Sequence, residues 1–356
     1  MSRVAAATYG RVAELPLEID SCELERLEQP VSSEFTRVAT VIWLRGGGEE
    51  GVGEDVTYDP VAHDAFQQHD QELPLTGRRT FDEFSEFVGS LALFSAGLDQ
   101  PAYLNYRRWG FESAALDLAL RQARTSLADA LQLEPHPVRY VASLRLPVPP
   151  SLEPLQRWLE HYPGLRFKLD PTSAWDAELI AGLGQLDRVD IVDLKGAYKG
   201  TPVDQEPDPA LYDRVASGFP YAWIEDPALT PETDRVLEPH RDRITWDAPI
   251  HSVEDVLALP FPPRMLNVKP SRFGSVRGLF EFYDWCGSHG VGTYGGGQFE
   301  LGPGRGQIQY LASLFHPDAP NDVAPSGFNA GLRPGLARSP LDPAPEPIGF
   351  RRRQDA

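Results

Sequence analysis

The segments Leu165-Arg-Phe-Lys-Leu-Asp170, 177–186 and Val189-Asp-Ile-Val-Asp-Leu-Lys195 decide the fold class. The first and third are short, mainly apolar runs of strand length, and the segment between them has the periodicity of an amphipathic helix. A strand, a helix and a second strand in this order predict two parallel strands joined by a crossover helix.

The same alternation continues along most of the chain. Further strand candidates lie at 138–144, 221–225, 243–247, 265–269, 290–294 and 321–324. Helical patterns lie between them at 152–162, 209–217, 230–239, 253–259 and 275–287. Eight strands with crossover elements favour an α/β fold of the (β/α)₈ barrel type. The last two units carry the weakest signal, because 292–306 is rich in glycine and reads mainly as loop.

The first 137 residues have a different pattern. Strand-like runs at 23–28, 37–45 and 51–53, with a glycine turn at 46–48, are typical of an antiparallel sheet. Helical patterns follow at 80–87 and 111–131. We therefore expect an α+β capping domain at 1–137 and the barrel at 138–331. The tail, 332–356, is rich in Pro and Arg and is expected to fold back as an extended segment or to fray.

Charge and composition exclude several classes of protein. The chain has 33 basic and 52 acidic residues and a net charge of −19. This balance argues against binding to nucleic acid, which needs a basic surface, and against docking on an anionic membrane. No apolar run approaches the ~18 residues of a membrane span. With only two cysteines, a disulfide framework is not expected and the cytoplasm is the predicted location.

Ionisable residues gather where the predicted strands end. Five consecutive strands end in one or two of them: Lys168 and Asp170, Asp193 and Lys195, Glu225, Asp247, and Lys269. In a (β/α)₈ barrel the carboxyl ends of the strands build the active site. The chain has 29 Arg and only four Lys, and three of those four Lys belong to this set.

The chemistry of this set points to a metal. Three carboxylates from adjacent strands form an oxygen cage suited to Mg²⁺, and neighbouring lysines are placed to take or return a proton. Unpaired charges are costly to bury, so packing alone does not explain the cluster. The alternative is a web of Lys–Asp and Lys–Glu ion pairs at the barrel rim, which would not explain why nearly all the lysines meet there. Asp226 follows Glu225 with the opposite strand parity, and we interpret it as a loop or helix-cap residue.

Several motifs resemble the enolase superfamily, in particular its muconate cycloisomerase-like branch, which includes o-succinylbenzoate synthases and dipeptide epimerases. Four of them are Trp223-Ile-Glu-Asp-Pro227, Trp246-Asp247, Asn267-Val-Lys-Pro-Ser-Arg-Phe-Gly274 and Gly297-Gln-Phe-Glu-Leu-Gly-Pro-Gly304. Residues 35–55 are similar to the capping domain of that family, and 112–120 to the helix before its barrel.

The resemblance implies roles for individual residues. Asp193, Glu225 and Asp247 would bind Mg²⁺, for which Mn²⁺ can substitute. Lys269 would be the sixth-strand lysine and Lys168 the first lysine of a second-strand Lys-x-Lys motif; such sites pair a base with one or two Mg²⁺ ions.

The resemblance also implies a small carboxylate as the substrate. Gln298 and Glu300 would face the substrate, and the cap loops 28–36 and 54–58 would set specificity. Family members commonly form even-numbered oligomers, so a homo-oligomer is the expectation. We also expect the glycines at 295–297 to offer backbone N–H groups to an anionic ligand.

Two departures from the family pattern stand out. Asp170 replaces the second lysine of Lys-x-Lys, and Lys195 stands where the family often has Asn, from where it is placed to supply the missing cation. Asp170-Pro-Thr-Ser-Ala-Trp175 also resembles the segment that usually carries the first metal ligand. The number of strands favours Asp193 for that role, and Asp170 is the alternative.

The leading hypothesis is a Mg²⁺-dependent lyase or isomerase that removes the α-proton of a carboxylate to give an enediolate. Elimination, cycloisomerisation and epimerisation all remain open. A Schiff-base aldolase that uses Lys269 as its nucleophile is one alternative. A non-catalytic member of the superfamily that only binds a ligand is the other.

Overall fold

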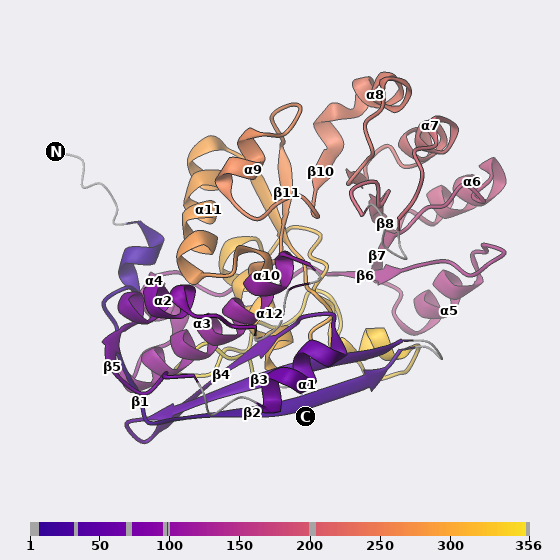
Figure 1. Ribbon diagram of the computed structural model, residues 1–356. Helices are drawn as coiled ribbons and strands as arrows, with labels where there is room; N and C mark the ends of the chain where they lie inside the picture. Colours follow the sequence, from indigo (N-terminus) through magenta and orange to yellow (C-terminus); the bar gives the residue numbers. More distant parts are fainter. Residues whose placement is uncertain are drawn as a thin grey trace.

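The computed structural model describes residues 7–31, 35–68, 73–94, 98, 100–198 and 204–353 (Figure 1). The predicted cap loop 28–36 is therefore described only in part, and Lys199 lies outside the described residues. Within these ranges, no helix is long and apolar enough to cross a lipid bilayer.

The cap is built on an antiparallel sheet. Its strands lie in the order β2 (Ser21–Pro30), β3 (Thr36–Gly46) and β4 (Glu49–Asp55). Gly47 and Gly48 have φ values of +58° and +79°, the left-handed pair that a tight hairpin requires. A second, two-stranded sheet pairs β1 (Pro16–Ile19) with β5 (Gly77–Thr80).

The cap also contains helices. They are η1 (Thr8–Arg11), α1 (Pro60–Gln68), α2 (Phe81–Ser90), α3 (Ala102–Gln122) and α4 (Leu127–Leu131). Helix α3 begins nine residues before the predicted 111–131 helix and is separate from α4. Glycine lets β4 lie directly against α3, since a Cβ atom on Gly51 would be 2.2 Å from the carbonyl oxygen of Ala114.

Among the residues that the structure describes, the barrel has seven parallel strands in sequential order. They are β6 (Val141–Leu144), β7 (Arg166–Leu169), β8 (Val189–Asp193), β9 (Trp223–Glu225), β10 (Ile244–Trp246), β11 (Met265–Val268) and β12 (Gly292–Gly295). The predicted eighth strand at 321–324 is reduced to two isolated parallel bridges, Tyr140 with Asn321 and Gly296 with Asp322. These bridges connect the two edges of the curled sheet, so the α/β barrel architecture that the sequence predicted is confirmed.

Helices connect successive strands on the outside of the barrel (Figure 1). They are α5 (Glu153–His161), α6 (Ala177–Leu186), α7 (Pro209–Gly218), α8 (Pro231–Leu237), η3 (Glu238–Arg243), α9 (Val253–Leu257), α10 (Pro270–Phe273), α11 (Val276–His289), α12 (Pro303–Phe315) and η4 (Ser326–Ala330). Local sequence starts several of them: the side chains of Asp176, Asp208 and Ser275 accept backbone N–H groups at the first turns of α6, α7 and α11.

The strand predicted at 290–294 is present, but the expectation that 292–306 is mainly loop was wrong at its C-terminal end. Strand β12 fills its first four residues, and helix α12 begins at Pro303, where proline is compatible with the first turn. The carboxylate of Glu54 in the cap accepts the backbone N–H groups of Leu301, Gly302 and Gly304, at 2.6, 3.0 and 2.9 Å. This long-range cap explains why local composition did not reveal the helix.

The C-terminal segment returns to the cap (Figure 1). Leu341 pairs with Val138, and Phe350 is fully buried. Asp117 of α3 accepts the backbone N–H of Phe350 at 2.7 Å and the Nε of Arg351 at 2.6 Å. The segment therefore packs on both the barrel and the cap.

Candidate active site at the barrel mouth

The strand ends of β7 to β11 bring the predicted ionisable residues together. The side chains of Lys168, Asp193, Glu225, Asp247 and Lys269 are each at most 9% exposed. Period-two alternation explains their common direction, since residues at every second position share a face of the sheet. Beneath them the barrel is filled by an apolar layer of Val141, Ile191, Trp223, Met265 and Tyr294.

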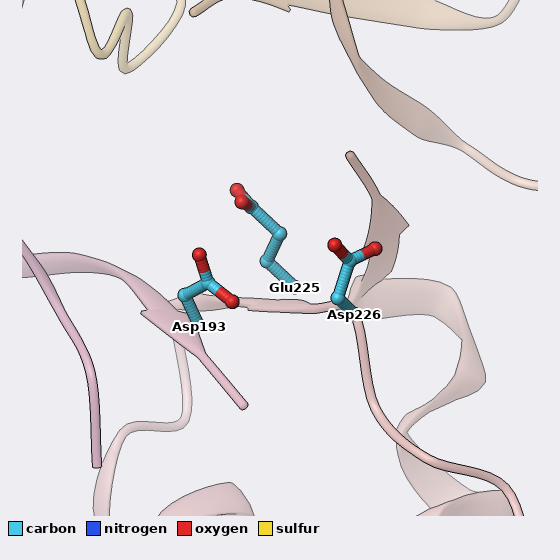
Figure 2. A group of neighbouring side chains, drawn as sticks. All are labelled: Asp193, Glu225 and Asp226. Carbon is cyan, nitrogen blue, oxygen red and sulfur yellow. The ribbon is translucent and has the colours of Figure 1, made fainter. Parts of the chain in front are cut away.

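Three buried carboxylates lie close enough to share one metal ion. Asp193, Glu225 and Asp226 each offer an oxygen within 4.8 Å of the others, and Figure 2 shows the three side chains at the ends of β8 and β9. Asp226 also lies in the loop directly after β9, as predicted from its position on the opposite face of the strand. Its backbone is left-handed, with φ +46°, and its carboxylate accepts the N–H groups of Asp247 and Ala248 at 2.8 and 2.9 Å.

Asp247 lies beside this group and is held by other partners. It accepts hydrogen bonds from Lys269 Nζ at 2.8 Å, from Arg272 Nη1 at 2.6 Å and from the Tyr198 hydroxyl at 2.8 Å. Burial disfavours its charge, but Arg272 and Lys269 outweigh this effect and lower the pKa of Asp247 below its ordinary value. Asp247 is thus a charged carboxylate next to the other three.

Lys168 holds the two central carboxylates. Its Nζ is 3.1 Å from Asp193 Oδ2, is hydrogen-bonded to Glu225 and lies 3.6 Å from Asp322. The hydroxyl of Tyr294 donates to the other oxygen of Glu225. Burial works against the ammonium charge, but Glu225 and Asp193 prevail and raise the pKa of Lys168 well above its ordinary value.

Lys195 and Asp170 form the outer part of the cluster. The backbone of Lys195 is left-handed, with φ +54°, an unusual conformation for a residue other than glycine. Its N–H donates to Asp193 Oδ1 at 3.1 Å, and its Nζ bonds the same carboxylate and lies 3.6 Å from Asp170. All three lysines within the described ranges therefore meet at this mouth.

Lys269 has a different electrostatic environment from the other two lysines. It is largely buried, and burial lowers its pKa; Asp247 opposes this effect and Arg272 reinforces it. Lys195, by contrast, has a raised pKa, because Asp193 and Asp170 outweigh its burial. The structure thus distinguishes one lysine that loses its proton more easily from two that keep it.

Gln298 and Glu300 lie where the barrel meets the cap. The Gln298 amide donates to the Tyr106 hydroxyl at 2.9 Å and accepts from that of Tyr58 at 3.4 Å. Glu300 accepts the backbone N–H of Gln298 at 2.6 Å and lies 3.1 Å from Arg305. Both residues are at most 5% exposed.

The expectation for the glycines at 295–297 was wrong for two of them. The N–H of Gly295 donates to Asn321 Oδ1 at 2.7 Å, and that of Gly296 donates to the Val268 carbonyl at 2.9 Å. Both groups therefore serve the barrel itself. Glycine at 296 instead leaves room, because a Cβ atom there would be 2.4 Å from Asn267 Oδ1 and 2.9 Å from Lys269 Cε.

Sequence reasoning missed four residues of the cluster: Arg272, Tyr198, Tyr294 and Asp322. Two of them had a usable signal, because Tyr294 and Asp322 lie in predicted strand segments whose parity could have been followed. Arg272 lies in the short helix after β11, and Tyr198 in the loop after β8. The partners of these two could not be found from local sequence.

The residues at the mouth fit a hard divalent cation. Carboxylate oxygen is the donor that Mg²⁺ prefers. The cluster contains six carboxylates, Asp170, Asp193, Glu225, Asp226, Asp247 and Asp322, and four cationic groups, Lys168, Lys195, Lys269 and Arg272. Burial and the neighbouring carboxylates raise the pKa of Glu225 well above its ordinary value and that of Asp226 to about 7, so a bound cation would favour the ionised forms of both.

Comparison with known proteins places the chain in a family. Two models, described as the N-terminal and C-terminal domains of a domain of unknown function (DUF8230), match residues 10–130 and 134–330. The chain belongs to the DUF8230 family. Among curated proteins, o-succinylbenzoate synthase of Bacillus subtilis (strain 168) is 26% identical over 264 residues, which is 71% of this chain and 67% of that protein.

Solved structures show the fold of this DUF8230 protein. A member of the enolase superfamily from Listeria innocua matches with a TM-score of 0.66 and 18% identity, over 87% of this chain and 86% of that one. A dipeptide epimerase from Methylococcus capsulatus, solved with a Mg ion, matches with a TM-score of 0.64 and 18% identity, over 86% and 89% of the two chains. The fold is that of the enolase superfamily, as the sequence resemblance predicted.

Proposed function

We propose that this DUF8230 protein is a Mg²⁺-dependent lyase or isomerase that removes the α-proton of a small carboxylate substrate. The observation that carries the proposal is the convergence, in this fold, of buried carboxylates and three lysines at the ends of adjacent strands. An α-proton of a carboxylate is very weakly acidic, so positive charge is needed to stabilise the enediolate. Bound Mg²⁺ supplies that charge.

Asp193, Glu225 and Asp247 would hold the metal. Asp193 and Glu225 already belong to the group that could share one ion. Asp247 is preferred to Asp226 as the third ligand, because the oxygens of Asp226 are held by the backbone N–H groups of Asp247 and Ala248, which are fixed. The oxygens of Asp247 are held by side chains, which a metal can displace. Asp170 is not a member of the close group, which favours Asp193 as the first ligand.

Lys269 is the proposed group that moves the α-proton. Its Nζ is 2.8 Å from Asp247, so a carboxylate substrate beside the metal would lie within its reach. Lys168 and Lys195 would act on the opposite side as positive charges that orient the substrate, with Asp170 fixing Lys195. Gln298 and Glu300, at the junction with the cap, would contact the part of the substrate away from the metal.

The test is exchange of α-protons with solvent. Protein with Mg²⁺ in D₂O would be incubated with a panel of dipeptides and aliphatic dicarboxylates, all of which carry α-protons, and loss of α-proton signals would be followed by NMR. We expect at least one compound to exchange with wild type. Exchange should be lost with Lys269→Met and after removal of Mg²⁺ by a chelator. If no compound exchanges although Mg²⁺ binds, the proposal is wrong.

A further inference from the structure

Asn267 is a buried polar residue that the proposed function has not used. It lies on β11, two residues before Lys269, and so shares the inward face of the strand with that lysine. It is only 1% exposed. Neither its Oδ1 nor its Nδ2 atom has a hydrogen-bond partner among the described residues.

Such an unpaired amide is unusual in a folded protein. Buried polar groups are nearly always hydrogen-bonded, because burial without a partner destabilises the fold. A neighbouring asparagine shows the ordinary arrangement. Asn321 accepts the N–H of Gly295 at 2.7 Å and donates to the carbonyls of Arg139, His316 and Ala319, each at 2.9 Å.

The Asn267 amide lies beside the Lys269 side chain, next to Gly296. A Cβ atom on Gly296 would collide with both Asn267 Oδ1 and Lys269 Cε, so both side chains reach the same point beside the end of β12. The backbone of Gly296 is not left-handed, so its conformation does not require glycine. Glycine at this position keeps space for the amide and for the lysine.

We propose that Asn267 is a substrate-binding residue. Its amide hydrogen-bonds an oxygen of the carboxylate group whose α-proton is removed, on the side of the mouth that Lys269 occupies. An N–H of this amide suits an oxygen that gains negative charge as the proton leaves. This inference rests on the proposed function and adds to it a neutral donor that the metal cage and the lysines do not provide.

Asn267→Leu tests the inference, because leucine has nearly the same size and removes both unpaired atoms. The midpoint of thermal unfolding should be equal to or above that of wild type. Mg²⁺ affinity, measured by calorimetry, should be unchanged. The variant is assayed with the compound whose α-proton wild type exchanges fastest. The exchange rate should fall by about 100-fold or more, which is the usual effect of losing one preorganised hydrogen-bond donor. Asn321→Leu, which removes a fully bonded amide, should lower the unfolding midpoint.

Two results would overturn the inference while leaving the proposed function intact. One is exchange by Asn267→Leu at the wild-type rate. The other is an unfolding midpoint below that of wild type, since this would mean that the amide has a structural partner in the folded protein. Absence of exchange by wild type would instead overturn the proposed function, and the unfolding midpoint would still decide whether Asn267 is unpaired.

Discussion

At the scale of single residues, Lys168 is the side chain on which the cluster depends most. Its ammonium group contacts both Asp193 and Glu225, and all three side chains are at most 2% exposed. A buried charge that loses its partner is strongly destabilising. Lys168 therefore has a structural role in addition to the catalytic role that we propose for it.

Lys168→Met should lower the free energy of unfolding by about 3–5 kcal/mol, because two buried carboxylates lose a shared cation. Mg²⁺ should restore part of this loss, since an ion that binds only the folded state stabilises it. Lys195→Met is the matched control and should cost less, because Lys195 and Asp170 are each 15% exposed. Urea unfolding with and without Mg²⁺ measures the loss of stability in each variant and the part that Mg²⁺ restores. Equal losses of unfolding free energy in the two variants would contradict this structural role of Lys168.

Asp247 and Asp226 should respond differently to loss of charge. Asp247→Asn should weaken Mg²⁺ binding at least ~10-fold, since a charged ligand is lost. Asp226→Asn should leave Mg²⁺ affinity nearly unchanged but lower stability by about 1–2 kcal/mol, because its carboxylate accepts two backbone N–H groups and the amide offers one oxygen. Calorimetry and thermal unfolding separate the two effects, and the reverse pattern would make Asp226 the third ligand.

At the scale of elements, strand ends were predictable and helix α12 was not. The positions of Asp193, Glu225 and Lys269 followed from alternation along short strands, which is a local property of the sequence. Helix α12 depends on the carboxylate of Glu54, about 250 residues away in the chain, which satisfies N–H groups at its start. The hydrogen bonds from Arg272 and Tyr198 to Asp247 likewise depend on tertiary packing, so they could not be predicted from the sequence.

Glu54 makes the junction between β4 and α12 sensitive to pH. Burial, with a smaller effect of Glu300, raises the pKa of Glu54 to about 7, against an ordinary value of 4.5. The folded state therefore binds this proton more tightly than the unfolded chain. The stability that the proton contributes is complete below pH 4.5 and is lost as the pH rises through 7.

Glu54→Gln isolates this effect. Between pH 5 and pH 8 the free energy of unfolding of wild type should fall relative to that of the variant by about 2–3 kcal/mol, since each pKa unit of difference is worth about 1.4 kcal/mol. Chemical unfolding of both proteins at the two pH values gives the difference directly. A difference that stays constant with pH would show that Glu54 is ionised throughout.

At the scale of the whole molecule, the C-terminal segment joins the cap to the barrel. Phe350 is fully buried, and its backbone is anchored to Asp117. Phe350→Ala should cost about 3–5 kcal/mol, as large-to-small changes of buried aromatic residues do. Tyr221→Ala, at a side chain that is 90% exposed, should change stability by less than ~0.5 kcal/mol. Comparable unfolding midpoints for the two variants would contradict a structural role for the segment.

The central claim is that the carboxylates of the barrel mouth bind a divalent metal. The most direct test is a calorimetric titration of wild type, Asp193→Asn, Glu225→Gln and Asp170→Asn with Mg²⁺. We predict that one ion binds to wild type and to Asp170→Asn, and that binding is lost in Asp193→Asn and Glu225→Gln. Failure of wild type to bind Mg²⁺ would contradict the presence of a metal site. Loss of binding in Asp170→Asn alone would contradict the assignment of Asp193 and Glu225 as its ligands.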